Sequence, residues 1–176
     1  MKRICSIIIL ITIFAIGNIK ISNAQRYAVI DTRYILSKMP EYADADVQLK
    51  KMSTQWQREV AKMQTDLDAM RKDFQAEQYM LTDELKQKRE IEIANKEKMV
   101  RDLNTKYFGY EGELFVQRKR LVQPIQDKIY NAVQNMAVTR GYDFILDKSE
   151  GITVIFADPK LNKSDDILVS LGIKTK

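Results

Sequence analysis

The sequence contains no histidine and only one cysteine, Cys5, in a chain of 176 residues. Cys5 lies in an N-terminal apolar run that we expect to be removed, so the remaining chain offers neither an imidazole nor a thiol. Zinc or copper sites built from these groups are therefore excluded, and so are Ser-His-Asp and Cys-His nucleophile pairs. The sequence also lacks a glycine-rich phosphate-binding loop. We predict no catalytic residue, no metal and no cofactor, and hence a protein that is not an enzyme.

Residues 1–24 have the pattern of a cleaved secretory signal. Lys2 and Arg3 precede an apolar run at 4–17 that is too short to span a bilayer comfortably, and the small residues at 22–24 suit a cleavage site. We expect cleavage after Ala24, with an uncleaved N-terminal anchor as the alternative. Three of the 29 Lys and Arg residues leave with this segment, so 26 remain against 24 Asp and Glu. This near balance does not favour a nucleic-acid partner.

Glycine and proline are absent between Tyr42 and Tyr107, and Pro40 suits the first turn of a helix. Apolar residues recur inside this stretch in alternating steps of four and three, which is the repeat of a coiled-coil seam. Thr82, followed by two acidic residues, is a good helix N-cap, so we expect the chain to reverse near 79–84. The seam positions are Trp56, Val60, Met63, Leu67, Met70 and Phe74.

An antiparallel hairpin with this tip pairs residues whose numbers sum to about 163, in an arm about 60 Å long at 1.5 Å per residue. In that register both helices place apolar residues in the seam, which supports the hairpin. The expected pairs are Trp56 with Tyr107, Val60 with Leu103, Met63 with Val100 and Met70 with Ile93, continuing to Leu49 with Leu114 and Tyr42 with Leu121.

Two glycines, Gly109 and Gly112, interrupt the returning half of the hairpin. Each lowers helix propensity by about 1 kcal/mol, and Pro124 further along removes a helical hydrogen bond. The glycines are candidates for a hinge that lets the distal arm swing, while a tolerated irregularity of the helix is the alternative. Gly141 is a natural left-handed cap at which the returning helix should end.

Short apolar segments at both ends of the chain predict a small β body. Strands are expected at 26–32, 142–147 and 152–157, with the last two joined as a hairpin through 148–151. Ser164 is expected to cap a final short helix. The predicted fold class is α+β, with a body formed by 25–40 and 122–176 and with a helical hairpin arm formed by 41–121.

A body of three short strands and one helix buries too little surface to support such an arm alone, and no disulfide or metal is available. The apolar strands also leave edges that another copy of the chain could pair with. A closed ring of subunits would satisfy these edges, and a trimer or a similar small ring is consistent with cyclic symmetry.

The order of segments resembles the Skp or OmpH-like family of periplasmic chaperones of Gram-negative bacteria. The resemblance covers an opening YAVIDTRYIL, the helical hairpin, LVQPIQDKIYNAV leading into GYDFILDKS, then ITVIFADP and SDDILVSLG. It implies a homotrimer whose strands close into a β-barrel and whose three arms enclose a cavity for unfolded outer-membrane proteins. The FGYEGELF segment departs from an unbroken arm.

The arm offers candidate client contacts near its tip, where partners within the chain are few. Methionine and aromatic side chains can repack around varied partners. Met63 and Met70 are instead expected to fill the seam, because the register requires them there. The client-contact candidates are Phe74, Tyr79, Met80 and Leu81.

Basic residues after the tip form a second candidate site, a basic arm patch. They could attract acidic clients, anionic lipid or lipopolysaccharide, with an attraction that salt weakens. The alternative, which we favour, is a solvated helix face, because acidic residues are interleaved at spacings that allow ion pairs along the helix. The patch consists of Lys86, Lys88, Arg89, Lys96, Lys98 and Arg101.

Together these features predict an ATP-independent periplasmic holdase that binds unfolded outer-membrane proteins between its arms and prevents their aggregation. Release must be passive, because no nucleotide site is apparent. The alternative function is a structural or adaptor coiled-coil protein of the cell envelope. A chaperone should leave apolar surface exposed on the arms, whereas a scaffold should bury its seam.

Overall fold

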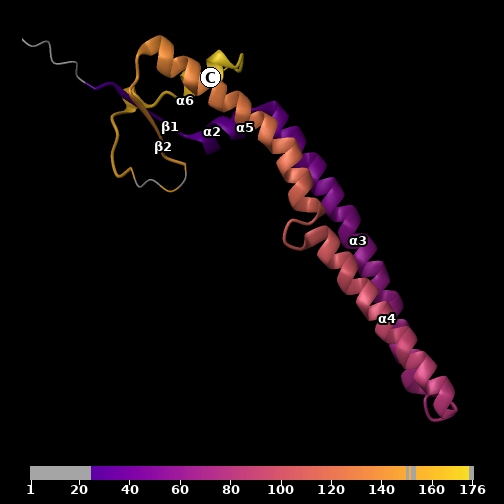
Figure 1. Ribbon diagram of the computed structural model, residues 1–176. Helices are drawn as coiled ribbons and strands as arrows, with labels where there is room; N and C mark the ends of the chain where they lie inside the picture. Colours follow the sequence, from indigo (N-terminus) through magenta and orange to yellow (C-terminus); the bar gives the residue numbers. More distant parts are fainter. Residues whose placement is uncertain (1–24, 150, 152–153, 175–176) are drawn as a thin grey trace, which may run out of the picture.

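The computed structural model describes residues 25–149, 151 and 154–174. The expected signal segment at 1–24 therefore lies outside the described residues. The described chain is mostly helical, with a long arm that extends from a small body containing two strands (Figure 1).

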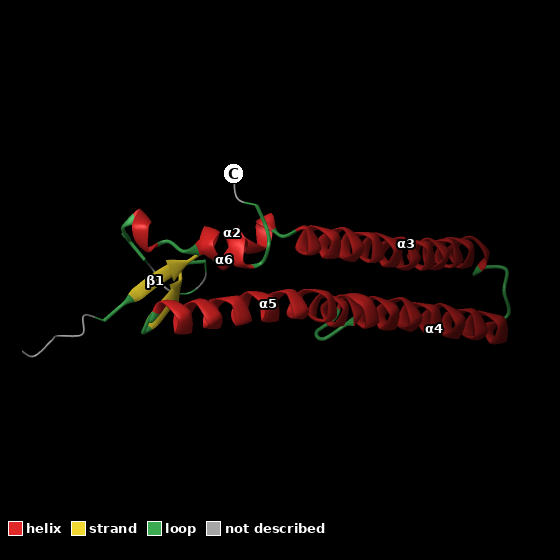
Figure 2. Cartoon of the chain, turned by 90° about the horizontal axis from the view of Figure 1, so that it is seen from above, coloured by secondary structure: helices red, strands yellow, loops and turns green. Residues whose placement is uncertain are grey.

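Three long helices build the arm: α3 (Pro40–Glu77), α4 (Asp83–Phe108) and α5 (Glu113–Arg140). Pro40 occupies the first turn of α3, as expected from its fixed backbone angle. The chain reverses at 78–82, and the side chain of Thr82 accepts a hydrogen bond from the backbone N–H of Leu85, which confirms the predicted cap. Figures 1 and 2 both show α3 running beside α4 and then beside α5.

The seam between α3 and α4 contains the aromatic pair that the sequence predicts. The rings of Trp56 and Tyr107 stack with centroids 4.9 Å apart and planes 8° apart. The Tyr107 hydroxyl donates a hydrogen bond of 2.9 Å to Glu59 on α3. Leu67 and Val100 are buried in the same seam. The pairing of Trp56 with Tyr107 is thus confirmed, and it fixes the register at this point of the arm.

The returning half of the arm is two helices rather than one. α4 ends at Phe108 and α5 begins at Glu113, while α3 continues past the break without interruption. Beyond the break α3 packs against α5, and the Lys128 ammonium lies 2.7 Å from the Glu41 carboxylate. The predicted pairs of Leu49 with Leu114 and of Tyr42 with Leu121 stay predictions.

The sheet has two parallel strands, β1 (Tyr27–Ile30) and β2 (Phe144–Asp147), with Tyr27 opposite Phe144. Parallel strands need a long crossover connection, and here the whole arm supplies it. Within the described residues β2 pairs only with β1, at the other end of the chain, so the predicted hairpin after β2 is not found there. The predicted third strand is wrong over 154–157, which contain no strand; its residues 152–153 lie outside the described residues.

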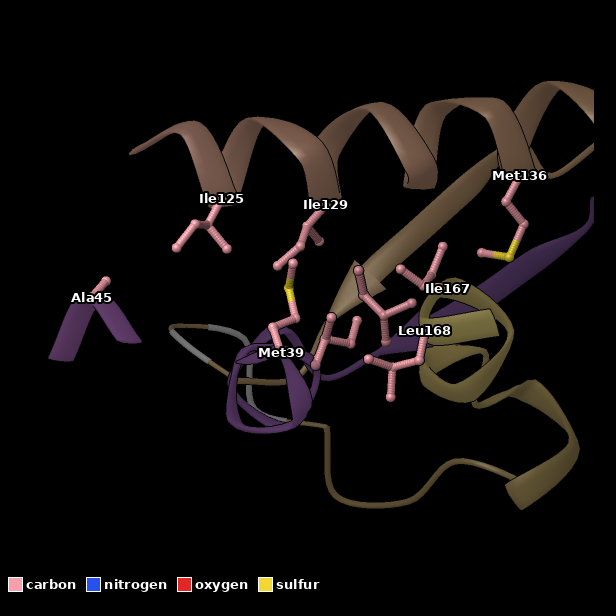
Figure 3. Close-up of a cluster of buried hydrophobic side chains, with 9 residues drawn as sticks. Met39, Ala45, Ile125, Ile129, Met136, Ile167 and Leu168 are labelled. Atoms are coloured by element: carbon pink, nitrogen blue, oxygen red, sulfur yellow. The ribbon is translucent and has the colours of Figure 1, made fainter. Parts of the chain in front are cut away.

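The core of the body lies between β1, α5 and two short helices, α2 (Thr32–Lys38) and α6 (Ser164–Ser170). A one-turn helix, η1 (Pro159–Leu161), precedes α6. Apolar side chains from these elements converge, with Ile167 and Leu168 of α6 fully buried between α5 and α2 (Figure 3). The buried cluster consists of Ile30, Ile35, Met39, Ala45, Ile125, Ile129, Met136, Ile167 and Leu168.

Two helix-end predictions have different outcomes. Gly141 ends α5 in the left-handed conformation, with φ 64° and ψ 47°, as predicted. Ser164 does not cap α6, because Lys163 occupies that position without a side-chain cap. The buried Ser164 hydroxyl instead accepts a hydrogen bond of 2.9 Å from the Asp31 backbone N–H, so it ties α6 to the start of α2.

Candidate functional site

The four client-contact candidates at the tip have two different environments. Tyr79 and Met80 lie in the turn and are 86% and 81% exposed. Phe74 and Leu81 are half-buried. Phe74 lines a shallow hollow between α3 and α4 that also includes Ile93. The tip thus offers one aromatic and one thioether side chain to a partner.

Ion pairs occupy four of the six cations in the basic arm patch. Lys86 pairs with Asp83 at 3.6 Å, Arg89 with Glu92 at 3.3 Å, Lys96 with Asp66 at 3.7 Å and Arg101 with Glu97 at 3.7 Å. At about 100° per residue, the six positions are also spread around α4 rather than along one face. Lys88 and Lys98 form no ion pair with any described residue, so they carry most of the free charge.

A further ion pair joins the two helices of the distal arm. The Arg71 guanidinium lies 2.6 Å from the Glu97 carboxylate across the seam. The hydrogen bond from Arg71, with the positive charges of Arg71 and Arg101, lowers the pKa of Glu97. The carboxylate therefore remains charged at neutral pH and in mild acid.

The hinge candidates form a tight turn between α4 and α5. A Cβ atom added to Gly109 would lie 2.4 Å from the Thr105 carbonyl oxygen, and one added to Gly112 would lie 3.0 Å from two backbone oxygens. Glu111 between them adopts a positive φ of 55°. The compact backbone of this turn, rather than conformational freedom alone, therefore favours glycine at both positions.

The break exposes a group of side chains that were not among the predicted sites. Tyr110 in the turn is 97% exposed, and Phe115 and Val116 at the start of α5 are about half-exposed. With Lys119 and Arg120 on the next turn of α5, these residues form what we call the elbow surface. Four of the five, all except Tyr110, line a hollow of about 710 Å³.

Polar groups in the body form hydrogen bonds that stabilise the fold rather than a reaction site. Asp147 at the end of β2 accepts hydrogen bonds from the backbone N–H groups of Thr32, at 3.1 Å, and Ser149, at 3.0 Å, and from the Thr32 hydroxyl. Burial alone would raise the pKa of Asp147, but these hydrogen bonds outweigh it and lower the pKa. The charged carboxylate therefore stabilises the junction between the sheet and α2.

Neither a metal site nor a membrane span occurs in the part of the chain that the structure describes. No group of three or more metal-ligating side chains comes together there. None of its helices has the length and apolar character needed to cross a bilayer.

Comparison with known proteins identifies the family. A sequence profile described as "Outer membrane protein (OmpH-like)" matches residues 26–171, which is most of the chain. The chain belongs to the OmpH-like family.

A solved structure supports the fold of this OmpH-like chain. The crystal structure of a candidate outer membrane chaperone (OmpH-like) from Caulobacter crescentus superimposes with a TM-score of 0.68 at 14% sequence identity. The match covers 87% of this chain and 88% of the other. The comparison with curated protein sequences finds no match.

The elbow surface of the OmpH-like chain was not among the predicted sites, but it has a signal in the sequence. Lys119 and Arg120 have no acidic residue three or four positions away on either side, whereas every cation of the basic arm patch has one. Phe115 and Val116 lie one turn before these two cations. Unpaired charge beside apolar residues on a helix is therefore the pattern that would have indicated this surface.

Proposed function

We propose that this protein is an ATP-independent periplasmic holdase that binds unfolded outer-membrane proteins and prevents their aggregation. Family membership supports the general role. The observation that carries the mechanism is the nearly complete exposure of Tyr79, Met80 and Tyr110, which lie in the turns of the arm and outside its seam. Apolar groups held outside the seam are available to a partner.

We further propose that three copies assemble and that their arms enclose the client cavity. The face of the body supports association, because Ile155 and Phe156 are 94% and 83% exposed in the single chain. The described residues also provide no strand beyond β2, so its outer edge is open. Burying apolar residues and pairing an open strand edge are the two gains that a closed β-barrel of three chains would bring. Native mass spectrometry should give the mass of a trimer, and a monomer at micromolar concentration would contradict the assembly.

The holdase function can be tested by light scattering. An outer-membrane β-barrel protein is diluted from urea into buffer with and without the purified protein, at one trimer per client. We expect scattering to be largely suppressed, because many weak contacts on several arms act together. A soluble protein of similar charge is the control. Scattering equal to that control would refute the function.

The glycine turn is proposed as a point of local opening in the returning half of the arm. α3 is continuous beside it, so opening must separate the turn from α3 or bend α3. Hydrogen exchange should be faster at 107–113 than in the flanking turns of α4 and α5, because fewer backbone groups are bonded there. Equal protection across the three segments would show that the turn is a fixed irregularity.

The cations of α4 are proposed to assist binding of acidic clients or anionic lipid, including lipopolysaccharide. Lys88 and Lys98 carry this proposal, because ion pairs hold the other four cations. Replacing both with glutamine should weaken flotation with phosphatidylglycerol vesicles at low salt. The matched control replaces the paired Arg89 and Arg101 with glutamine. A smaller loss in the Lys88 and Lys98 variant than in the control would contradict the assignment.

A further inference from the structure

We propose that the elbow surface, rather than the tip of the arm, is the main docking site for extended client segments that combine apolar side chains with acidic ones. This inference deepens the proposed function and rests on it. The site consists of Tyr110, Phe115, Val116, Lys119 and Arg120.

The apolar part of the elbow surface is accessible to a partner. Tyr110 projects from the turn with almost no contact to the rest of the chain, and Phe115 and Val116 lie along an open, shallow hollow on α5. The tip, in contrast, exposes two such side chains, Tyr79 and Met80. Three exposed apolar groups can remove more apolar surface of a bound segment from water than two, so the elbow surface should bind an apolar segment more strongly.

Charge complementarity points to an acidic segment. Lys119 and Arg120 are exposed and form no ion pair or hydrogen bond with any described residue. Glu111 and Asp127 are the first and last residues along the hollow, and neither pairs with these cations. A carboxylate placed beside the two cations would therefore gain attraction without breaking an existing pair.

The dimensions of the hollow suit an extended chain. It lies along the first fifteen residues of α5, which rise by about 21 Å at 1.5 Å per residue. A strand rises about 3.3 Å per residue, so about six residues of a client would lie along it. Strands of outer-membrane barrels alternate apolar and polar side chains, which places about three apolar groups on one face.

The location of the site also suits capture between arms. Figure 1 shows the glycine turn projecting midway along the arm, from the side on which the sheet lies. A segment bound there lies between the body and the tip. The break in the returning helix adds Tyr110 to this surface, because a continuous helix would leave no projecting turn.

A pair of labelled peptides can test the proposal on the full-length mature protein. Each peptide has twelve residues, with Phe and Leu alternating with Asp and Ser in one and with Lys and Ser in the other. Fluorescence anisotropy should show that Lys119→Gln with Arg120→Gln weakens binding of the acidic peptide by about tenfold, with little change for the basic one. Phe115→Ser with Val116→Ser should weaken binding of both peptides.

Matched variants make the result specific. Lys88→Gln with Lys98→Gln removes the same charge from α4, and Tyr79→Ser with Met80→Ser removes apolar groups from the tip. Both regions are themselves proposed to contribute to client binding, so we expect a measurable loss for each, but a smaller one than for the elbow variants. An effect at the tip or on α4 equal to that at the elbow surface would overturn it, as would unchanged peptide binding in the elbow variants. Circular dichroism should show unchanged helicity, because every replaced side chain is exposed.

The outcome is separable from that of the holdase assay. If the wild-type protein suppresses client aggregation but the elbow variants bind peptide normally, the docking site is wrong and the function stands. If the wild-type protein fails to suppress aggregation, the function fails whatever the peptides do. If the elbow variants lose binding only to phosphatidylglycerol vesicles, or change only the oligomer mass, a lipid or a second copy is the occupant and the proposal is overturned.

Discussion

The arm and the body of this protein differ in how much of each is buried. Only Ala45, Leu49 and Leu67 are buried among the 38 residues of α3. In α6, Ser164, Ile167 and Leu168 are buried among only 7 residues. The arm therefore gains little stability per residue from its packing, while most of its surface remains available for binding. The body is small but concentrates the contacts that hold distant parts of the chain together.

Polar interactions repeat this contrast. Cross-helix ion pairs on the arm, such as Arg71 with Glu97, are partly exposed to solvent. In the body, the Ser164 hydroxyl and the Asp147 carboxylate bond to backbone groups far away in the sequence. Breaking an ion pair on the arm leaves both charges in water, whereas breaking one of these hydrogen bonds in the body leaves a backbone N–H without its partner. The energetic cost should therefore be greater in the body.

The largest effect should come from the body core. Leu168→Ala removes a fully buried side chain and should lower the free energy of unfolding by about 2–5 kcal/mol. Urea denaturation at one fixed protein concentration measures the change. Val169→Ala, at an exposed position of the same helix, is the control and should change stability by less than about 0.5 kcal/mol. Similar losses for the two variants would mean that α6 does not anchor the body.

A smaller and local effect is expected in the arm seam. Leu67→Ala should destabilise the packing of α3 against α4 by about 2 kcal/mol, because Leu67 is 2% exposed. The arm should open without unfolding the body, so hydrogen exchange should accelerate near residues 60–75 and not at β1 or β2. Val47→Ala, at an exposed position of α3, is the control. Acceleration throughout the chain would show that the arm and the body unfold as one unit.

The hydrogen bonds that Asp147 accepts should make the stability of the body sensitive to acid. Its pKa is lowered in the folded chain, so it contributes stability above its unfolded pKa, near 3.8, and that contribution is lost as pH falls through the lower folded value. Asp147→Asn should cost about 1 kcal/mol at pH 7 and should reduce the loss of stability below about pH 4. Asp102→Asn, at an exposed position of α4, is the control. Parallel pH profiles for wild type and Asp147→Asn would refute this role.

The smallest effect should come from the ion pair across the arm. Glu97→Gln should slightly accelerate hydrogen exchange in the distal arm, and the difference should vanish at 1 M salt, where screening removes it. Since the pKa of Glu97 is lowered from 4.5, the contribution should also persist to below that pH. Glu90→Gln on the same helix is the control. A difference that survives high salt would indicate packing rather than charge.

The arm could be predicted from the sequence better than the body, because its contacts join residues closer together in the chain. The four-three repeat and Thr82 act within a few residues, so Trp56 could be paired with Tyr107 from the pattern alone. The length of the break between α4 and α5 could not be predicted, because helix propensity does not say how many residues leave the helix at Gly109 and Gly112. The parallel pairing of β1 with β2 has no signal in the residues next to either strand. A hairpin with the next apolar segment was the prediction that neighbouring residues favoured.

The candidate binding surfaces also differ in how far the sequence could predict them. Exposure of Tyr79 and Met80 followed from their place in the tip. The elbow surface depends on where the helix breaks and on which cations lack partners after folding. Ser164 shows the same limitation, since its N-terminal position in a helix suggested a cap while its actual partner, Asp31, lies far away in the sequence.

The parallel sheet has a consequence for the order in which the chain folds. Tyr27 pairs with Phe144, and the neighbouring Arg26 and Asp143 bond across 117 positions of the sequence. Contacts between α3 and α4 close much shorter loops and should form sooner. A chain that emerges with its N-terminus first can therefore fold the distal arm before β2 is available to pair with β1. The part of the molecule that offers client contacts would then exist before the part that anchors it.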